Sequence, residues 1–465
     1  MRRGLAIVGD SVAEFRGGRA RLARLEEQFA SAVEAPLAAA FAAQHSEEAR
    51  VLCGHLVAVQ REDAAQRLYC AARLAPLQAL WEGYTPATPF VAWLPGFYEQ
   101  AAEALAAEGR WLAGALPEAC PAFLLALLAE LLAAIERPFR QRLGAAMAAP
   151  PGSVLPLEHL EQAAAAARDF AGLLASQLEE AGALERSVFS ARLYERVVAP
   201  VEEALLSYAD RELSFLTAEL LQLVRQACAR AEAAVRGDPA GEGPAATLGG
   251  ALPPAASALA AALSRCLRLT GGTGLPALAR VTDRAASQFV GALEAGMASL
   301  RGGGGAASDL DAAEEAAPLL TIAAQLVSLL AEAEAGLRSA AAETAPRLLA
   351  AAGSGGEAPF APDGLPDAAV LRLRSQPSVL QQLSSMAAAV GADSPANLLP
   401  LASAAAVELE RGVGAHVEAV LTARVRQAMA GLAALPEWRQ RAGALPLPTF
   451  SAYPLQYVTS GEGVT

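Results

Sequence analysis

Lysine is missing from this sequence of 465 residues, and all 36 basic residues are arginine. A chain without lysine cannot form a lysine Schiff base, and it lacks the lysine with which P-loops and protein kinases contact phosphate. Histidine and cysteine are scarce, with four and five residues. They are His45, His55, His159 and His416, and Cys53, Cys70, Cys120, Cys228 and Cys266. Neither set has the paired spacing of a structural zinc site, which predicts reduced, buried thiols and no metal or other cofactor.

Positive charge and long apolar runs are also in short supply. The formal net charge is −13, whereas a protein that binds nucleic acid needs a basic face, so we expect no nucleic-acid partner. The longest apolar run, residues 121–135, contains Glu130 and is shorter than a membrane span. The apolar stretch that follows Arg3 is too short for a secretory signal. Any membrane association is therefore expected to be indirect, through bound partners.

Alanine and leucine, by contrast, are abundant. Hydrophobic residues make up 54% of the chain and aromatic residues only 5%, a composition that favours helix packed on helix. Apolar residues recur at helical spacing in several stripes. The stripes are Leu22, Leu25 and Phe29; Phe123, Leu124, Leu127, Leu128, Leu131, Leu132 and Ile135; Leu213, Leu216, Leu220, Leu223 and Val224; and Leu319, Ile322, Leu326, Leu329 and Leu330. The sequence predicts an all-α fold, an elongated stack of antiparallel helices that forms a rod.

Proline and glycine divide this helical pattern, because neither residue continues a helix without a cost. At this length more than one packed unit is expected. We predict an N-terminal helical bundle region at 1–236 and a C-terminal one at 257–460, separated by a flexible Gly/Pro-rich insert at 237–256. Two further flexible inserts are predicted at 301–308 and 353–366.

Three local patterns resemble catalytic motifs but lack what the chemistry needs. Residues 271–274 read Gly-Gly-Thr-Gly, but neither a lysine nor a strand accompanies them, so a loop is predicted. Residues 353–356 do not have the glycine spacing of a nucleophile elbow. Acidic residues at 309–315 are typical of a solvated helix N-terminus, where they complement the helix dipole. We therefore expect no catalytic residues and no enzymatic activity.

Aromatic residues are concentrated in two segments, 81–98 and 438–457. Such rings can fill the core where two helices meet at a turn. They can also anchor a partner, since Trp and Tyr are enriched at binding hot spots, and the sequence leaves both interpretations open. The residues that we single out as structural or partner-contact positions are Trp93, Phe97, Tyr98, Phe450, Tyr453 and Tyr457.

The same two segments carry a family resemblance. Residues 90–100, FVAWLPGFYEQ, resemble the W-L-P-x-F-Y segment of subunit 7 of the conserved oligomeric Golgi complex. Residues 447–460, LPTFSAYPLQYVTS, resemble the L-P-T-F-S-x-x-P-L-x-Y-I-T/S stretch near the C-terminus of that subunit. Because the segments keep their order and lie far apart, we expect the resemblance to cover most of the chain. Family members have a longer N-terminal region and continue past the second segment, so we expect a fragment.

The resemblance implies a non-catalytic subunit of a Golgi vesicle-tethering complex, acting in retrograde intra-Golgi transport and indirectly in protein glycosylation. It implies a peripheral protein on the cytosolic face of the Golgi membrane, which assembles with subunits 5, 6 and 8 and contacts vesicle fusion machinery. The residues alone leave two alternatives. One is another all-helical scaffold or adaptor, such as a different tether subunit or a helical repeat. The other is an all-α enzyme with a lipid-like substrate, which would need a cavity lined by facing acidic residues.

Overall fold

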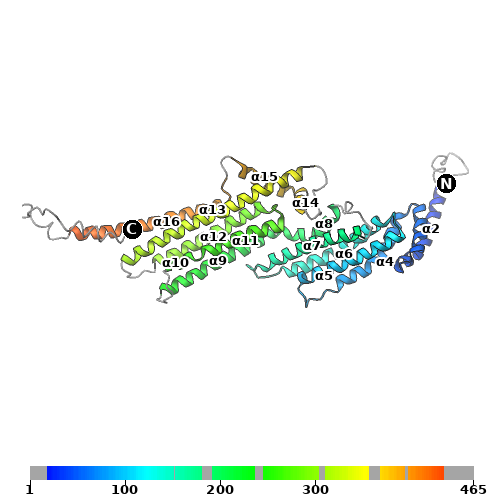
Figure 1. Cartoon of the computed structure of the whole chain (residues 1–465), viewed down its shortest axis with the longest axis horizontal. Helices are drawn as coiled ribbons and strands as arrows, with labels where there is room; N and C mark the ends of the chain where they lie inside the picture. The colour runs from blue at the N-terminus through cyan, green and yellow to red at the C-terminus, as the bar shows by residue number, and fades with distance from the viewer. Residues whose placement is uncertain are drawn as a thin grey trace, which may run out of the picture. The chain divides into compact units, whose positions relative to one another are not determined.

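The computed structural model describes residues 18–150, 152–180, 191–235, 244–302, 309–354, 367–392 and 396–433. Within these ranges the chain forms helices joined by short turns, and no strand occurs in them (Figure 1). The predicted all-α fold is confirmed. The abundance of alanine explains this outcome, since alanine has the highest helix propensity and its small side chain lets neighbouring helices approach closely.

The chain divides into two compact units that are each discontinuous in sequence. Unit 1 comprises Met1–Tyr208, Leu269–Gly271 and Arg347–Leu380, and unit 2 comprises Ala209–Arg268, Gly272–Pro346 and Gln381–Thr465. This division differs from the two contiguous regions expected from the sequence. Proline and glycine mark where helices end, but they do not show that a late helix packs among early ones.

Unit 1 is built from neighbouring early helices and one late helix. They are α2 (Gly18–Ala42), α3 (Ser46–Ala58), α4 (Glu62–Glu82), α5 (Phe90–Ala115), α6 (Cys120–Ala146), α7 (Leu155–Glu180), α8 (Ala191–Leu205) and the late α14 (Ala368–Ser375). Helix α5 packs against α6 and α7, α4 packs against α2 and α6, and α8 contacts both α6 and α14. The Asp367 side chain caps α14 by accepting a hydrogen bond of 2.9 Å from the Ala369 amide.

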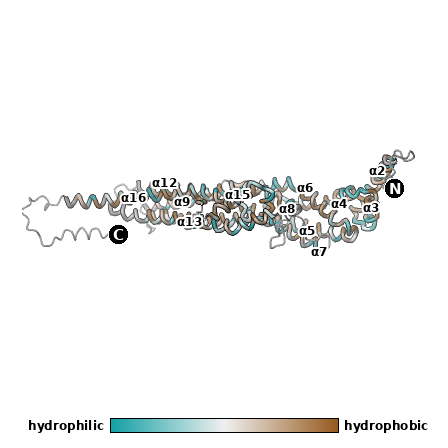
Figure 2. Tube along the Cα trace, turned by 90° about the horizontal axis from the view of Figure 1, so that it is seen from above, coloured by the Kyte–Doolittle hydropathy of each residue, from teal (hydrophilic) through white to brown (hydrophobic). Residues whose placement is uncertain are grey.

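Unit 2 contains the greater part, or the whole, of each remaining helix. They are α9 (Tyr208–Val235), α10 (Pro244–Gly249), α11 (Leu252–Thr270), α12 (Leu275–Gly302), α13 (Asp309–Gly353), α15 (Pro377–Gly391) and α16 (Pro400–Ala433). Helix α12 packs against both α10 and α16. Figures 1 and 2 show α9, α12, α13 and α16 lying side by side along this unit. The stacked helices agree with the predicted arrangement.

Most of the predicted apolar stripes face the core of their own unit. In α6, for example, Leu127 and Leu131 are almost fully buried, as are Leu216 in α9 and Leu326 in α13. Burying a leucine side chain contributes about 1.5–3 kcal/mol. These stripes therefore account for much of the packing between helices.

The stripe predicted near the N-terminus is an exception. Leu25 and Phe29 lie on helix α2 as their spacing predicts, but both are exposed. The buried face of α2 is formed instead by a later stripe: Ala30, Val33, Leu37, Ala40 and Phe41. Helix α2 therefore has more apolar residues than its core-facing side needs, and the excess lies on the surface.

A glycine turn at residues 271–274 joins α11 to α12. Gly271 and Gly272 have φ angles of 60° and 96°, in the left-handed region that residues with a side chain rarely adopt. A Cβ atom at Gly271 would also lie 2.9 Å from the Cβ atom of Ala369. The predicted loop is confirmed, and both backbone conformation and close packing account for its glycines.

The insert predicted at 237–256 is partly helical. Helix α10 begins at Pro244 and α11 begins at Leu252, and both Ala245 and Leu248 are buried. The prediction is therefore wrong for residues 244–256. The two prolines at 253–254 fall in the first turn of α11, where proline is tolerated because those amides have no helical acceptor. Residues 237–243, 303–308 and 355–366 of the predicted inserts lie outside the described residues.

Two helical stretches, Pro244–Thr270 and Pro318–Gly353, could cross a membrane when judged by length and apolar composition alone. Charged residues such as Arg265 and Glu332 interrupt both stretches, so neither is an uninterrupted apolar run in the sequence. Core helices of soluble proteins meet the same criterion, so two such stretches are weak grounds for a membrane span.

Candidate interaction surface

The aromatic residues of the first segment meet where α4 ends and α5 begins, in unit 1. The ring of Trp81 contacts those of Phe97 and Trp93, with centroids 5.1 and 5.5 Å apart. Trp93 stacks on Phe97 at 5.2 Å and meets Tyr84 edge-on at 5.1 Å. Residues 93 and 97 lie one helical turn apart, so both rings reach the same side of α5. We call this cluster, which also includes Phe90 and Phe139, the aromatic corner.

Arg142 of α6 covers the aromatic corner. Its guanidinium carbon lies 4.2 Å from the ring centroid of Trp81 and 4.6 Å from that of Tyr84, within cation–π range. Its Nη1 also donates a hydrogen bond of 3.1 Å to the backbone carbonyl of Trp81, near the C-terminal end of α4. Burial lowers the pKa of the Arg142 guanidinium, but arginine titrates so high that the group stays charged. Arg142 therefore ties α6 to the junction of α4 and α5.

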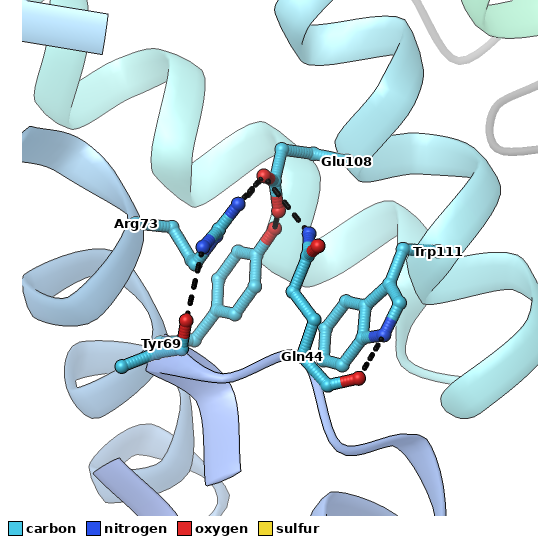
Figure 3. Close-up of polar contacts among 6 residues, drawn as sticks. Gln44, Tyr69, Arg73, Glu108 and Trp111 are labelled. Carbon is cyan, nitrogen blue, oxygen red and sulfur yellow. Dashed lines mark hydrogen bonds and ion pairs between the residues drawn. The ribbon is translucent and has the colours of Figure 1, made fainter. Parts of the chain in front are cut away.

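A second cluster in unit 1 surrounds the buried carboxylate of Glu108 (Figure 3). The carboxylate accepts hydrogen bonds from Tyr69 Oη at 2.9 Å, Arg73 Nε at 3.0 Å and Gln44 Nε2 at 3.3 Å. The indole nitrogen of Trp111 donates to the Gln44 carbonyl at 3.0 Å. Burial, with help from the neighbouring Glu108 charge, raises the pKa of Tyr69, which therefore stays protonated and donates. The cluster joins α4 and α5 to the turn after α2.

Burial also determines the chemistry of the thiols. It raises the pKa of Cys53 to about 12, and the pKa values of Cys70 and Cys120 to about 11. A thiol with such a pKa is a weak nucleophile at neutral pH. All five cysteines are free, four are buried as predicted and Cys228 is half-buried. In the part of the chain that the structure describes, no group of three or more His, Cys, Asp or Glu residues could hold a metal ion.

Unit 1 exposes an apolar patch on α2 and α3. Leu25, Phe29 and Val51 are 55%, 42% and 54% exposed. The ring of Phe29 meets that of His55 edge-on at a centroid distance of 5.8 Å, which brings the two helices together at the surface. His55 lies one turn after Val51 on the same face of α3, just as Phe29 lies one turn after Leu25. We call these four residues, three apolar and one histidine, the α2–α3 patch.

The residues predicted as structural or partner contacts differ in exposure. Phe97 and Tyr98 are buried, and Tyr98 stacks on Phe170 of α7 with ring centroids 4.4 Å apart. Trp93 is half-buried, so part of its indole remains open to a partner. Its contact with a partner stays a prediction. Three predicted residues lie outside the described part of the chain, namely Phe450, Tyr453 and Tyr457.

Three features of unit 1 were not predicted from the sequence: the Glu108 cluster, Arg142 and the α2–α3 patch. The patch could have been predicted, because the sequence of α2 contains two apolar stripes on different faces of the helix. Only one of these faces can pack against the core, so the other stripe has to be exposed. For Glu108 and Arg142 the sequence contains no such signal, because their partners lie 39 and 61 residues away in the chain.

Comparison with known proteins adds what the geometry alone does not reveal. A sequence model of the family described as Golgi complex component 7 matches residues 1–462, nearly the whole chain. The chain belongs to the Golgi complex component 7 family. The resemblance carried by residues 90–100 and 447–460 is thereby confirmed, and so is its predicted coverage of most of the chain.

One relative in the Golgi complex component 7 family is named conserved oligomeric Golgi complex subunit 7, from Arabidopsis thaliana. It is 24% identical to this chain over 553 aligned positions, which cover 99% of this chain and 66% of the relative. The chain thus spans just under two thirds of the length of the relative that it matches. No solved structure matches the chain.

Proposed function

We propose that this chain is a non-catalytic subunit of the conserved oligomeric Golgi complex and acts in tethering vesicles during retrograde intra-Golgi transport. The observation that carries the proposal is the family match over residues 1–462. The protein acts as a peripheral component on the cytosolic face of the Golgi membrane. Its effect on protein glycosylation is indirect, through the placement of Golgi enzymes.

The side chains of unit 1 support binding rather than chemistry. The buried carboxylate of Glu108 accepts hydrogen bonds from three side chains of unit 1, and burial holds the thiols of Cys53, Cys70 and Cys120 protonated. At its surface the unit presents the α2–α3 patch. A patch of this kind suits an amphipathic helix that lays its apolar face across two helices.

The partners we propose are subunits 5, 6 and 8 of the complex, together with vesicle fusion machinery. The α2–α3 patch is proposed as one docking surface for another subunit. Since aromatic anchors carry a large share of the binding energy at protein interfaces, Phe29 is the residue on which this contact depends most.

The proposal is tested by purifying the tagged chain from its own cells and identifying the co-purifying proteins by mass spectrometry. We expect subunits 5, 6 and 8 to be recovered with the unaltered chain. A double variant, Leu25→Asp with Phe29→Asp, places charges in the patch and should reduce recovery of at least one subunit tenfold or more, because a desolvated unpaired charge costs several kcal/mol.

The matched control is Leu155→Asp with Leu206→Asp, which introduces the same two charges at positions of unit 1 that are 48% and 67% exposed and lie outside the patch. This variant should retain all three subunits. Equal loss in both variants would contradict the assignment of the patch. Recovery of a different helical assembly with the unaltered chain would contradict the proposed function itself and favour another scaffold or adaptor.

A further inference from the structure

A groove between α9 and α12 of unit 2 has a volume of about 550 Å³. Small uncharged residues of α12 form one wall of it, namely Ala292, Ala295, Gly296 and Ser299, and the buried Leu248 of α10 also lines it. The distance at which two helices pack depends on the side chains between them. The small residues of this wall therefore leave room for a further helix to lie close against α12.

The opposite wall, formed by α9, carries two charged residues of opposite sign, Arg225 and Glu232. Both are exposed, and neither has an ion-pair partner within the part of the chain that the structure describes. They are seven residues apart, so they lie on the same face of α9, about 10 Å from one another along the helix. Between them this face carries only the small side chains of Cys228 and Ala229.

This charge pattern is complementary to itself when two copies of α9 lie antiparallel. With a twofold axis between residues 228 and 229, Arg225 of each copy lies opposite Glu232 of the other. All four charges are then paired. A contact in which residue i meets j and j meets i is the isologous interface of a C2 dimer, the commonest symmetry among oligomers. The small residues at 228 and 229 lie where the two helices cross, so the helices can approach closely there.

The second copy of the chain satisfies conditions that an unrelated helix would have to meet by coincidence. Such a helix would need an acidic and a basic residue at the spacing of Arg225 and Glu232. In the twofold arrangement each α9 also lies against the α12 wall of the other copy, so that four helices pack together. Figure 1 shows α9 at one edge of unit 2.

We propose that two copies of the chain form a twofold dimer through the groove between α9 and α12. Arg225 of each copy pairs with Glu232 of the other. A contact of two helices from each copy is at the small end of protein interfaces, so we expect a weak dimer with a dissociation constant on the order of 10 μM. This contact is independent of the proposed function, because it needs no other subunit.

Sedimentation velocity of the purified full chain, from about 1 to 100 μM, tests the proposal. The unaltered chain should change from monomer to dimer over this range. Arg225→Glu brings like charges together at both symmetric contacts, and so does Glu232→Arg. Each should therefore raise the dissociation constant tenfold or more. The double variant, Arg225→Glu with Glu232→Arg, restores two pairs of opposite charge and should dimerise like the unaltered chain.

Mixing the two single variants provides a second measurement. Arg225→Glu has two acidic residues on this face of α9, and Glu232→Arg has two basic ones. Each copy is then complementary to the other, so the mixture should form a heterodimer although neither variant dimerises alone. Arg426→Glu makes the same charge change on an exposed position of α16, outside the groove, and should leave the dissociation constant unchanged.

A disulfide locates the twofold axis. Residue 229 lies next to the axis, so Ala229→Cys should cross-link two copies under mild oxidation. It should do so at least tenfold faster than Arg230→Cys, because residue 230 is exposed but lies about 100° further around the helix.

Three outcomes would overturn the proposal. The first is a chain that stays monomeric up to about 100 μM. The second is a dimer that both single variants form as tightly as the unaltered chain, which would assign dimerisation to another surface. The third is a loss of dimer in both single variants that is restored neither by the double variant nor by mixing. In that case the charges act on the fold of each copy and not across a twofold contact.

Discussion

Glu108 accepts hydrogen bonds from Tyr69, Arg73 and Gln44, so the loss of its carboxylate would leave three donors without an acceptor. The Glu108 side chain is 9% exposed and that of Arg73 17%, and breaking a buried ion pair from one side costs about 3–5 kcal/mol. We therefore expect Glu108→Ala to lower the free energy of unfolding by about 3–5 kcal/mol in chemical denaturation. Glu136→Ala removes a carboxylate from an ion pair in which both side chains are about half exposed, and should change it by less than about 1 kcal/mol. Similar losses in both variants would contradict this account.

Trp93 is the residue at which stability and partner binding can be separated. Trp93→Ala removes ring contacts with Trp81, Tyr84 and Phe97. Because the indole is only half-buried, we expect a loss of about 2–3 kcal/mol, below the 3–5 kcal/mol of a fully buried Trp. Thermal melting with co-purification measures both effects, and Trp93→Phe should restore most of the stability. A variant with unchanged melting and unchanged partners would show that this position matters to neither.

The gathering of aromatic residues in one segment could be predicted at this scale, but the Glu108 cluster could not. Trp81 and Trp93 lie close in sequence at a turn, so local spacing already indicates that their rings can meet. In contrast, Glu108 stands between alanine and glycine on a helix and looks like an ordinary surface charge. Its partners come from α4 and from the turn after α2, and only the packing of α4 against α5 and α2, which a single sequence does not specify, brings them within reach.

For a whole helix, an alanine-rich sequence does not show which face is buried. Residues 163–167 of α7 are five consecutive alanines, so their pattern has no preferred face. The structure buries Ala163, Ala166 and Ala167 and exposes Ala165. The alanine run therefore predicts a helix but not which of its faces is buried. Larger residues of α7 determine that face, such as Phe170, which stacks on Tyr98 of α5.

That orientation leads to a prediction for the contact between α5 and α7. Ala167→Leu places three extra carbon atoms in a fully buried position, and such overpacking costs about 1–3 kcal/mol. Ala165→Leu adds the same atoms on the exposed face and should change stability by less than about 0.5 kcal/mol. Urea denaturation of the two variants measures the difference. If both lose the same stability, the assigned face of α7 is wrong.

For the whole molecule, the sequence predicted the fold class and the presence of two packed regions, but not their membership. The late segment Arg347–Leu380 belongs to unit 1. Arg372 of α14 accounts for part of this, since it pairs with both oxygens of Glu202 in α8 at 2.6 Å and donates to the Thr270 carbonyl at 2.9 Å. The three residues are up to 170 positions apart, so no local pattern could have indicated the contact.

The membership of Arg372 in unit 1 predicts that its loss acts on that unit. Arg372→Met removes the hydrogen bonds to Glu202 and Thr270 and should cost about 3 kcal/mol, the lower end for a buried pair because the Glu202 side chain is still 24% exposed. In hydrogen exchange this corresponds to roughly a hundredfold faster opening of α8, whereas α12 of unit 2 should be unaffected. Arg411→Met, which breaks an exposed pair on α16, serves as the control and should leave α8 unchanged. Equal acceleration of α8 and α12 in Arg372→Met would mean that the two units open as a single cooperative body.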